Sequence, residues 1–164
     1  MRISGPLVAV ALGVALVGCG VRPTGVIGAG ESASGPTRGV RLYYASDSGL
    51  RGVPVLDREI ENLATVVKLL ASGPPPAEQL DGLTNLVRIG GYRVTGHDTR
   101  VTVRLEEPYE ETGRDLGTGQ LVCTLARAQS VLDPKVGADD VEVTLRAPGD
   151  AVLGPYRCAE FLNR

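Results

Sequence analysis

The sequence has no tryptophan, one phenylalanine, one histidine and three cysteines among its 164 residues. Because Phe161 and five tyrosines are its only aromatic residues, the core must be mainly Val, Leu, Ile and Ala. Lys and Arg (17) do not outnumber Asp and Glu (19), so the chain lacks the basic field that attracts nucleic acid. It contains no EF-hand, zinc or P-loop spacing. These absences argue against a nucleic-acid-binding protein and against the common metal and nucleotide sites.

The N-terminal apolar run is too short to cross a membrane. It follows Arg2 and covers residues 7–17, whereas a membrane-spanning helix needs about 20 apolar residues. A short basic region followed by such a run is typical of a secretory signal peptide. Residues 16–19, Leu-Val-Gly-Cys, resemble the bacterial lipobox, which implies lipidation of Cys19 after removal of residues 1–18. An ordinary signal peptide with an incidental cysteine is the alternative.

The predicted location follows from this anchor. Each buried CH₂ group contributes about 0.8 kcal/mol to membrane binding, so the several chains of a diacylglyceryl group hold firmly where one chain would not. Residues 19–38 comprise the lipidated cysteine and a segment rich in Gly, Ser, Thr and Pro, which is typical of a flexible tether. We expect an exported protein, anchored by lipid to the outer face of the bacterial cell membrane.

Residues 39–164 have the patterns of one α+β domain with a C-terminal tail. β-branched and alternating apolar residues predict strands, and apolar residues three and four apart predict two main helices, the first capped by Asp57. The order β-β-α-β-β-α-β predicts an antiparallel or mixed sheet of about four to five strands, with both helices packed on one face. The expected strands are 40–45, 50–55, 92–95, 100–105 and 141–145. The first expected helix covers 57–72, and the second starts near Asp115 or Thr118 and runs to about Leu132.

The stretch LLASGPPPAEQLDGL, residues 69–83, raises three possibilities: a catalytic loop, a proline-rich ligand or a structural junction. Gly73 is suited to end the first helix, and Pro74 bars its continuation. Three prolines are too few to specify docking of a polyproline II segment. We therefore predict a junction that redirects the chain beneath the sheet.

Four stretches resemble the GerMN domain, first associated with sporulation and germination proteins and common in secreted actinobacterial lipoproteins. They are VRLYYASDSGL, VVKLLASGPPPAEQLDGL, RVTVRLEEP and QLVCTLARA, which together cover most of residues 40–147. The Leu-Leu-x-x-Gly-Pro stretch is the most specific of them. Residues 84–87 depart from the pattern because they lack a proline often found there. The resemblance implies a fold related to the ring-building domains of secretion and sporulation assemblies, and it implies no catalytic residues.

Residues suited to catalysis are few. His97 is the only histidine and falls at the tip of a predicted hairpin, where a solvated turn residue is the simpler interpretation than a general base. The acidic pairs 106–107, 110–111 and 139–140 fall in polar connections, so a solvated surface is again simpler than glycosidase or metal chemistry. We predict no enzymatic activity, no cofactor and no metal.

Cys123 and Cys158 are the only cysteines after Cys19. An exported protein meets an environment that permits disulfides. Cys123 lies in the second predicted helix and Cys158 in the tail, so a bridge would hold the tail on the domain. Two buried free thiols are the alternative.

Two classes of function remain. The first is a non-catalytic, membrane-anchored lipoprotein whose domain binds another envelope protein through the side of the sheet or a strand edge. Thr102 and Thr144 would test such an edge. The second is an accessory lipoprotein that binds a small ligand or a cell-wall component. A core with one Phe and no Trp offers few stacking surfaces for sugars, which favours the first class.

Overall fold

The computed structural model describes residues 40–56, 58–110 and 113–162, all of which belong to one unit, residues 35–164. The predictions for the signal peptide, for Cys19 and for the tether lie outside the described residues. In the described part of the chain, no helix has both the length and the apolar character needed to span a membrane.

The domain is α+β with a four-stranded mixed sheet, which confirms the expected fold class. The sheet order is β3-β4-β5-β6, in which β4 and β5 are parallel and the other pairs antiparallel. The elements are β1 (Arg41–Ser46), β2 (Gly49–Pro54), α1 (Leu63–Ala71), α2 (Pro76–Leu80), β3 (Tyr92–His97), β4 (Arg100–Leu105), α3 (Leu116–Leu132), the 3₁₀ helix η1 (Ala138–Asp140), β5 (Glu142–Ala147), β6 (Ala151–Tyr156) and α4 (Ala159–Leu162).

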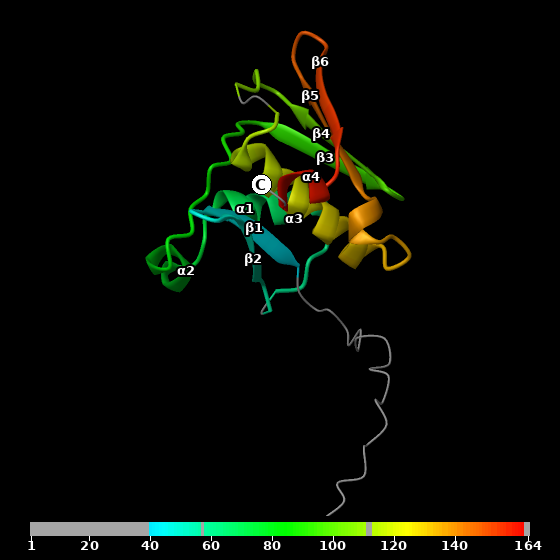
Figure 1. Cartoon of the computed structure of the whole chain (residues 1–164). Coiled ribbons are helices and arrows are strands. Elements are labelled where there is room, and N and C mark those ends of the chain that lie inside the picture. The colour runs from blue at the N-terminus through cyan, green and yellow to red at the C-terminus, as the bar shows by residue number, and fades with distance from the viewer. Residues whose placement is uncertain (1–39, 57, 111–112, 163–164) are drawn as a thin grey trace, which may run out of the picture. The chain divides into compact units, whose positions relative to one another are not determined.

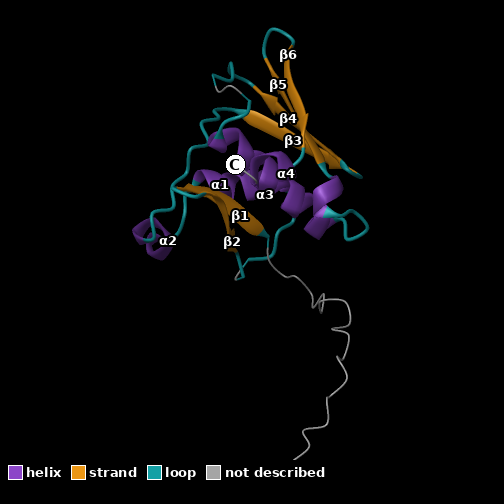
Figure 2. Cartoon of the chain, in the orientation of Figure 1, coloured by secondary structure: helices purple, strands orange, loops and turns teal. Residues whose placement is uncertain are grey.

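The first two strands do not join this sheet. β1 and β2 pair only with each other, as a separate two-stranded antiparallel sheet. Figure 1 shows the two sheets on opposite sides of α3, and the colouring of Figure 2 makes the strand–helix–strand layering plain. α3 accordingly contacts β1 and β2 on one side and β4 and β5 on the other.

The edge of β1 that is not paired with β2, which we call its free edge, explains why the sheets stay apart. The Tyr43 backbone N–H donates to Thr124 Oγ1 at 2.9 Å, and Gln120 Nε2 donates to the Tyr43 carbonyl oxygen at 3.1 Å. Further along, Ala45 and Thr84 exchange two backbone hydrogen bonds. Polar side chains of α3 and the chain near residue 84 therefore take the hydrogen-bonding positions that another strand would need.

α3 begins where the sequence indicates. The Asp115 carboxylate accepts from the Thr118 backbone N–H at 2.8 Å, an N-cap of the usual kind. Leu121, Leu125 and Ala128 are fully buried as expected, but Leu132, the last residue of the helix, is 36% exposed. Since sheets lie on two sides, α3 is buried around most of its circumference, including polar residues such as Gln120.

α1 starts later than the sequence suggested. Its N-cap is Asn62, whose side-chain oxygen accepts from the Thr65 backbone N–H at 2.9 Å. The prediction of Asp57 as the cap is therefore wrong, because Asn62 already satisfies the first turn and residues 58–62 are not helical. Residue 57 itself lies outside the described residues.

The tail contains two elements that the sequence did not reveal. β6 pairs antiparallel with β5 at one edge of the sheet, and α4 follows it. Gly154 and Pro155 hide β6 in the sequence, since proline is confined to edge strands and bulges. α4 places Phe161 over Gly119 of α3, where an added Cβ would lie 2.8 Å from Phe161 Cδ1, so the missing side chain permits the close approach.

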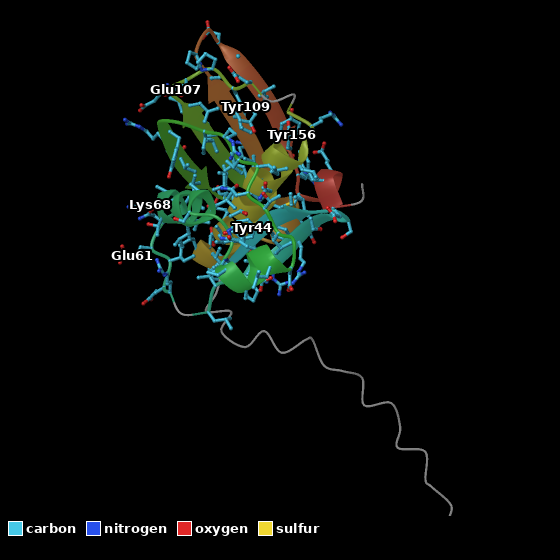
Figure 3. The ribbon with its side chains drawn as sticks, turned by 90° about the vertical axis from the view of Figure 1, so that its left-hand side faces the viewer. Tyr44, Glu61, Lys68, Glu107, Tyr109 and Tyr156 are labelled. Atoms are coloured by element: carbon cyan, nitrogen blue, oxygen red, sulfur yellow. A yellow bond between two sulfur atoms is a disulfide. The ribbon has the colours of Figure 1, made fainter. Side chains whose placement is uncertain are left out.

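The proline-rich stretch forms a junction between α1 and the two-stranded sheet. Gly73 adopts a φ of 82°, a backbone conformation that glycine accepts readily, and so ends α1. Its carbonyl oxygen accepts a hydrogen bond from the Tyr44 hydroxyl at 3.0 Å. Figure 3 shows Tyr44 in the interior of the domain, whereas Lys68 and Glu61 lie at the surface. After α2, Thr84 pairs with β1, so the stretch redirects the chain along the free edge of β1.

Tyr44 makes the stability of the domain sensitive to high pH. Burial raises the pKa of Tyr44 from 10.0 to about 12. Between these values the unfolded chain releases the phenolic proton and the folded protein keeps it, so ionisation favours unfolding. We expect the free energy of unfolding to fall by about 2 kcal/mol as pH rises from about 10 to about 12. Urea unfolding across this range is the measurement.

The matched variant is Tyr44→Phe. It should be about 1 kcal/mol less stable at neutral pH, because the Gly73 carbonyl loses its donor. The free energy of unfolding of this variant should also fall less steeply as pH rises above about 10. Part of the remaining fall comes from Tyr92, because burial raises its pKa as well. Equal alkaline slopes in the two proteins would contradict this role of Tyr44.

Candidate functional site

The four-stranded sheet has one buried and one open face. Residues of β4 and β5 that point toward the helices are buried, including Val101, Val103 and Leu145. Their neighbours in sequence point to the opposite side, which we call the open face. Alternation along each strand produces this division. The open face comprises Arg93, Thr95 and His97 of β3, Arg100, Thr102 and Arg104 of β4, and Glu142, Thr144 and Arg146 of β5.

Three arginines form a row across the open face. Arg93 of β3 is directly opposite Arg104 of β4, and Arg104 is in register with Arg146 of β5. All three are exposed, and none makes a salt bridge to a carboxylate within the described part of the chain. We call these residues the arginine row. Neighbouring strands are about 4.8 Å apart, so the row spans about 10 Å.

A row of threonines runs parallel to it. Thr95, Thr102 and Thr144 are in register across the same three strands, two residues away from the arginines. Two residues along a strand correspond to about 7 Å. Beside the two rows lies a hollow of about 500 Å³, lined by Arg93, Thr95, Thr102, Arg104 and Glu106. The centre of the open face thus combines guanidinium groups, hydroxyl groups and one nearby carboxylate.

The far end of the open face is more balanced in charge. Arg100 of β4 is in register with Glu142 of β5. Glu142 accepts a hydrogen bond from Arg157 Nη2 at 2.8 Å, and this contact and the Coulomb attraction of the carboxylate raise the pKa of Arg157. On the open face, Arg100 and the three arginines of the row make no salt bridge within the described part of the chain.

Thr102 and Thr144 do not mark a strand edge. They lie on β4 and β5, which are the two central strands, and they face each other in register. Substitutions at these two positions therefore test the open face of the sheet. The edge strands of the sheet are β3 and β6. The expectation failed because the sequence does not show which strands are central, and β6 was not recognised as a strand.

A second hollow lies at the proline-rich junction. It measures about 450 Å³ and is mainly apolar, with Leu42 and Val53 from the two-stranded sheet and Leu69 from α1. Residues 74–76 complete its wall. This hollow therefore includes part of the proline-rich stretch that the sequence singled out.

The residues considered for catalysis are at the surface. The His97 side chain is 90% exposed at the tip of the β3–β4 hairpin, and its Nδ1 atom is 2.8 Å from Asp98 Oδ2. Glu106, Glu107, Asp139 and Asp140 are exposed, and residue 111 lies outside the described residues. Within residues 40–56, 58–110 and 113–162 no three His, Cys, Asp or Glu side chains are grouped to hold a metal ion. That the domain uses no metal, cofactor or catalytic group stays a prediction.

The structure brings Cys123 and Cys158 together. Their sulfur atoms are 2.03 Å apart, at bonding distance, which joins the middle of α3 to the residue before α4. Nearby, the rings of Tyr156 and Phe161 make an edge-to-face contact with centroids 5.7 Å apart. The C-terminal segment is thus held on α3 by both a disulfide and aromatic packing.

No protein-family model, curated protein or solved structure matches this chain. The similarity to GerMN domains accordingly stays a prediction from the four stretches of sequence. The arginine row was missed at the sequence level. Arg and Thr alternate in residues 93–95, 102–104 and 144–146, but only the strand register shows that these pairs align.

Proposed function

We propose that this protein is a non-catalytic, membrane-anchored lipoprotein of the bacterial envelope whose domain binds another envelope protein. The lipid anchor is at Cys19, residues 20–38 are the tether, and the GerMN-like domain of residues 39–164 presents the binding surface. The ring-building type of fold belongs to the same proposal. It rests on the resemblance in sequence, which is an analogy of fold and not of chemistry.

The observation that carries the proposal is the uncovered open face of the four-stranded sheet. Helices cover only the other face, and the open face presents aligned polar and charged side chains over β3, β4 and β5. The hollow on this face is lined by charged and hydroxyl side chains and has no large apolar residue in its lining. Such a surface suits a protein partner better than an enclosed small molecule, which usually occupies a concave and mostly apolar site.

The apolar hollow at the proline-rich junction supports an alternative. A small apolar ligand or a cell-wall component would contact Leu42, Val53 and Leu69 there. Binding at that hollow should raise the melting temperature of the purified protein, because a ligand that binds only the folded state stabilises it. The open face would then have no part in recognition.

The anchor and the binding function can be tested together. We expect Cys19→Ala to release the protein from the membrane fraction and to weaken association with a membrane partner, since anchoring raises the local concentration of both proteins. Intact mass of the extracted protein reports the lipid, and a photocrosslinking residue at position 102 reports the partner.

A matched crosslinker at position 80 serves as control, because Leu80 is 91% exposed on α2, which lies away from the four-stranded sheet (Figure 1). An unlipidated protein with unchanged membrane retention would contradict the anchor. Failure of both crosslinking positions to capture any protein, together with stabilisation by a small molecule, would favour the alternative.

A further inference from the structure

The charge on the open face is opposite in sign to that of the whole chain. The protein has a formal net charge of −2, yet four arginines lie on this face: Arg93, Arg100, Arg104 and Arg146. The carboxylates that face them are Glu106, beside the hollow, and Glu142, which is bonded to Arg157. Positive charge is therefore locally in excess.

Folding alone does not account for this arrangement. Like charges directly opposite each other on neighbouring strands destabilise a sheet. Arg93 and Arg104 are such a pair, and Arg146 adds a third charge on the next strand. A row of this kind becomes favourable when negative groups lie between the guanidinium groups. The arrangement is therefore that of a binding surface for oxyanions.

The chemistry of the row favours carboxylates on a protein segment. A guanidinium group binds a carboxylate through two parallel hydrogen bonds, and threonine hydroxyls about 7 Å away can bond the backbone or polar side chains of the same segment. A broad anionic bilayer is a poorer match. Membrane-binding patches usually carry four to eight Lys or Arg. The four arginines of this face are at the lower end of that range, and Glu106 and Glu142 would face the anionic lipids as well. A narrow segment can contact the row and avoid both carboxylates.

We propose that the arginine row and its threonines bind an acidic segment of the partner protein, with Asp or Glu side chains placed between the guanidinium groups. This inference rests on the proposed function and specifies its partner by charge. Binding is electrostatic and exposed, so its strength falls as salt rises.

The test uses the full chain in detergent and a fluorescent peptide of alternating Glu and Thr, with an alternating Gln and Thr peptide for comparison. We expect only the acidic peptide to raise the anisotropy. R93Q/R104Q/R146Q should weaken its binding by about tenfold at low salt, the sum expected for three exposed charge contacts. The variant should remain folded with an equal or higher melting temperature, because the opposed charges are gone.

The matched control is Arg58→Gln/Lys68→Gln/Lys135→Gln, which removes the same charge at exposed positions away from the open face. Its affinity should change by less than about twofold. Equal weakening in both variants, or tighter binding to polyphosphate or to phosphatidylglycerol vesicles than to the acidic peptide, would overturn the inference.

The crosslinker at position 102 separates this inference from the proposed function. If a protein is captured equally by the wild-type chain and by R93Q/R104Q/R146Q, the proposed binding of an envelope protein stands. The role of the arginine row is then refuted. Capture that is lost in R93Q/R104Q/R146Q, together with loss of acidic-peptide binding, supports both. Absence of capture at every position counts against the proposed function itself.

Discussion

Replacing both bridging cysteines, as Cys123→Ala/Cys158→Ala, should lower the free energy of unfolding by about 3–4 kcal/mol. The bridge joins residues 35 apart in sequence, and closing a loop of that length removes a corresponding conformational entropy from the unfolded chain. The loss should be visible in urea unfolding at neutral pH. Wild-type protein treated with a reductant should unfold at nearly the same urea concentration as the double variant.

Part of this effect is local. Without the bridge, α4 loses its covalent link to α3 and keeps the packing of Phe161 against Gly119 of α3 and Tyr156 of β6. We therefore expect faster amide exchange in residues 157–162 of the double variant, before global unfolding. Thiol alkylation of the exported, non-reduced protein is the direct check. Free labelling of both cysteines, or unchanged stability after reduction, would show that the bridge does not form in the exported protein.

Gln120→Leu should destabilise the domain by about 3–5 kcal/mol. Gln120 is fully buried, and its amide group bonds three backbone groups at once. Its Oε1 atom accepts from the Leu86 N–H at 2.7 Å, and Nε2 donates to the carbonyl oxygens of Tyr43 at 3.1 Å and Thr84 at 3.2 Å. Leucine of similar size removes the partner of the Leu86 N–H and of the Tyr43 carbonyl oxygen, at about 1–3 kcal/mol each. The Thr84 carbonyl oxygen loses one hydrogen bond and keeps the one from the Ala45 N–H.

Gln129→Leu provides the matched control. Gln129 lies on the same helix and is 5% exposed, but its side-chain amide donates one hydrogen bond, from Nε2 to the Asp98 carbonyl oxygen at 2.9 Å. This variant should lose about 1–2 kcal/mol. Chemical unfolding of both variants gives the comparison. Equal losses would mean that the three contacts of Gln120 do not set its contribution.

Local structure could be read from the sequence where short-range chemistry decides it. The apolar helical pattern after Asp115 and Thr118 predicted a helix that starts near one of them, and Asp115 is its N-cap. Gly73 followed by Pro74 predicted the end of α1. Alternation of Val101, Val103 and Leu105 predicted which side of β4 is buried. Each of these features depends on residues within a few positions of one another, through capping, backbone φ or side-chain alternation.

Long-range pairing could not be read in the same way. The separation of the β1–β2 sheet depends on Gln120 and Thr124, which bond the free edge of β1 from a helix more than 70 residues later. The arginine row exists only because Arg93, Arg104 and Arg146 fall in register on β3, β4 and β5. A shift of one residue in any strand would turn its arginine toward the buried face. The sequence thus determined five of the strands, the two main helices and the two cysteines available for a bridge. The tertiary structure decided the layering and the charged surface, because register and edge bonding join residues that are distant along the chain.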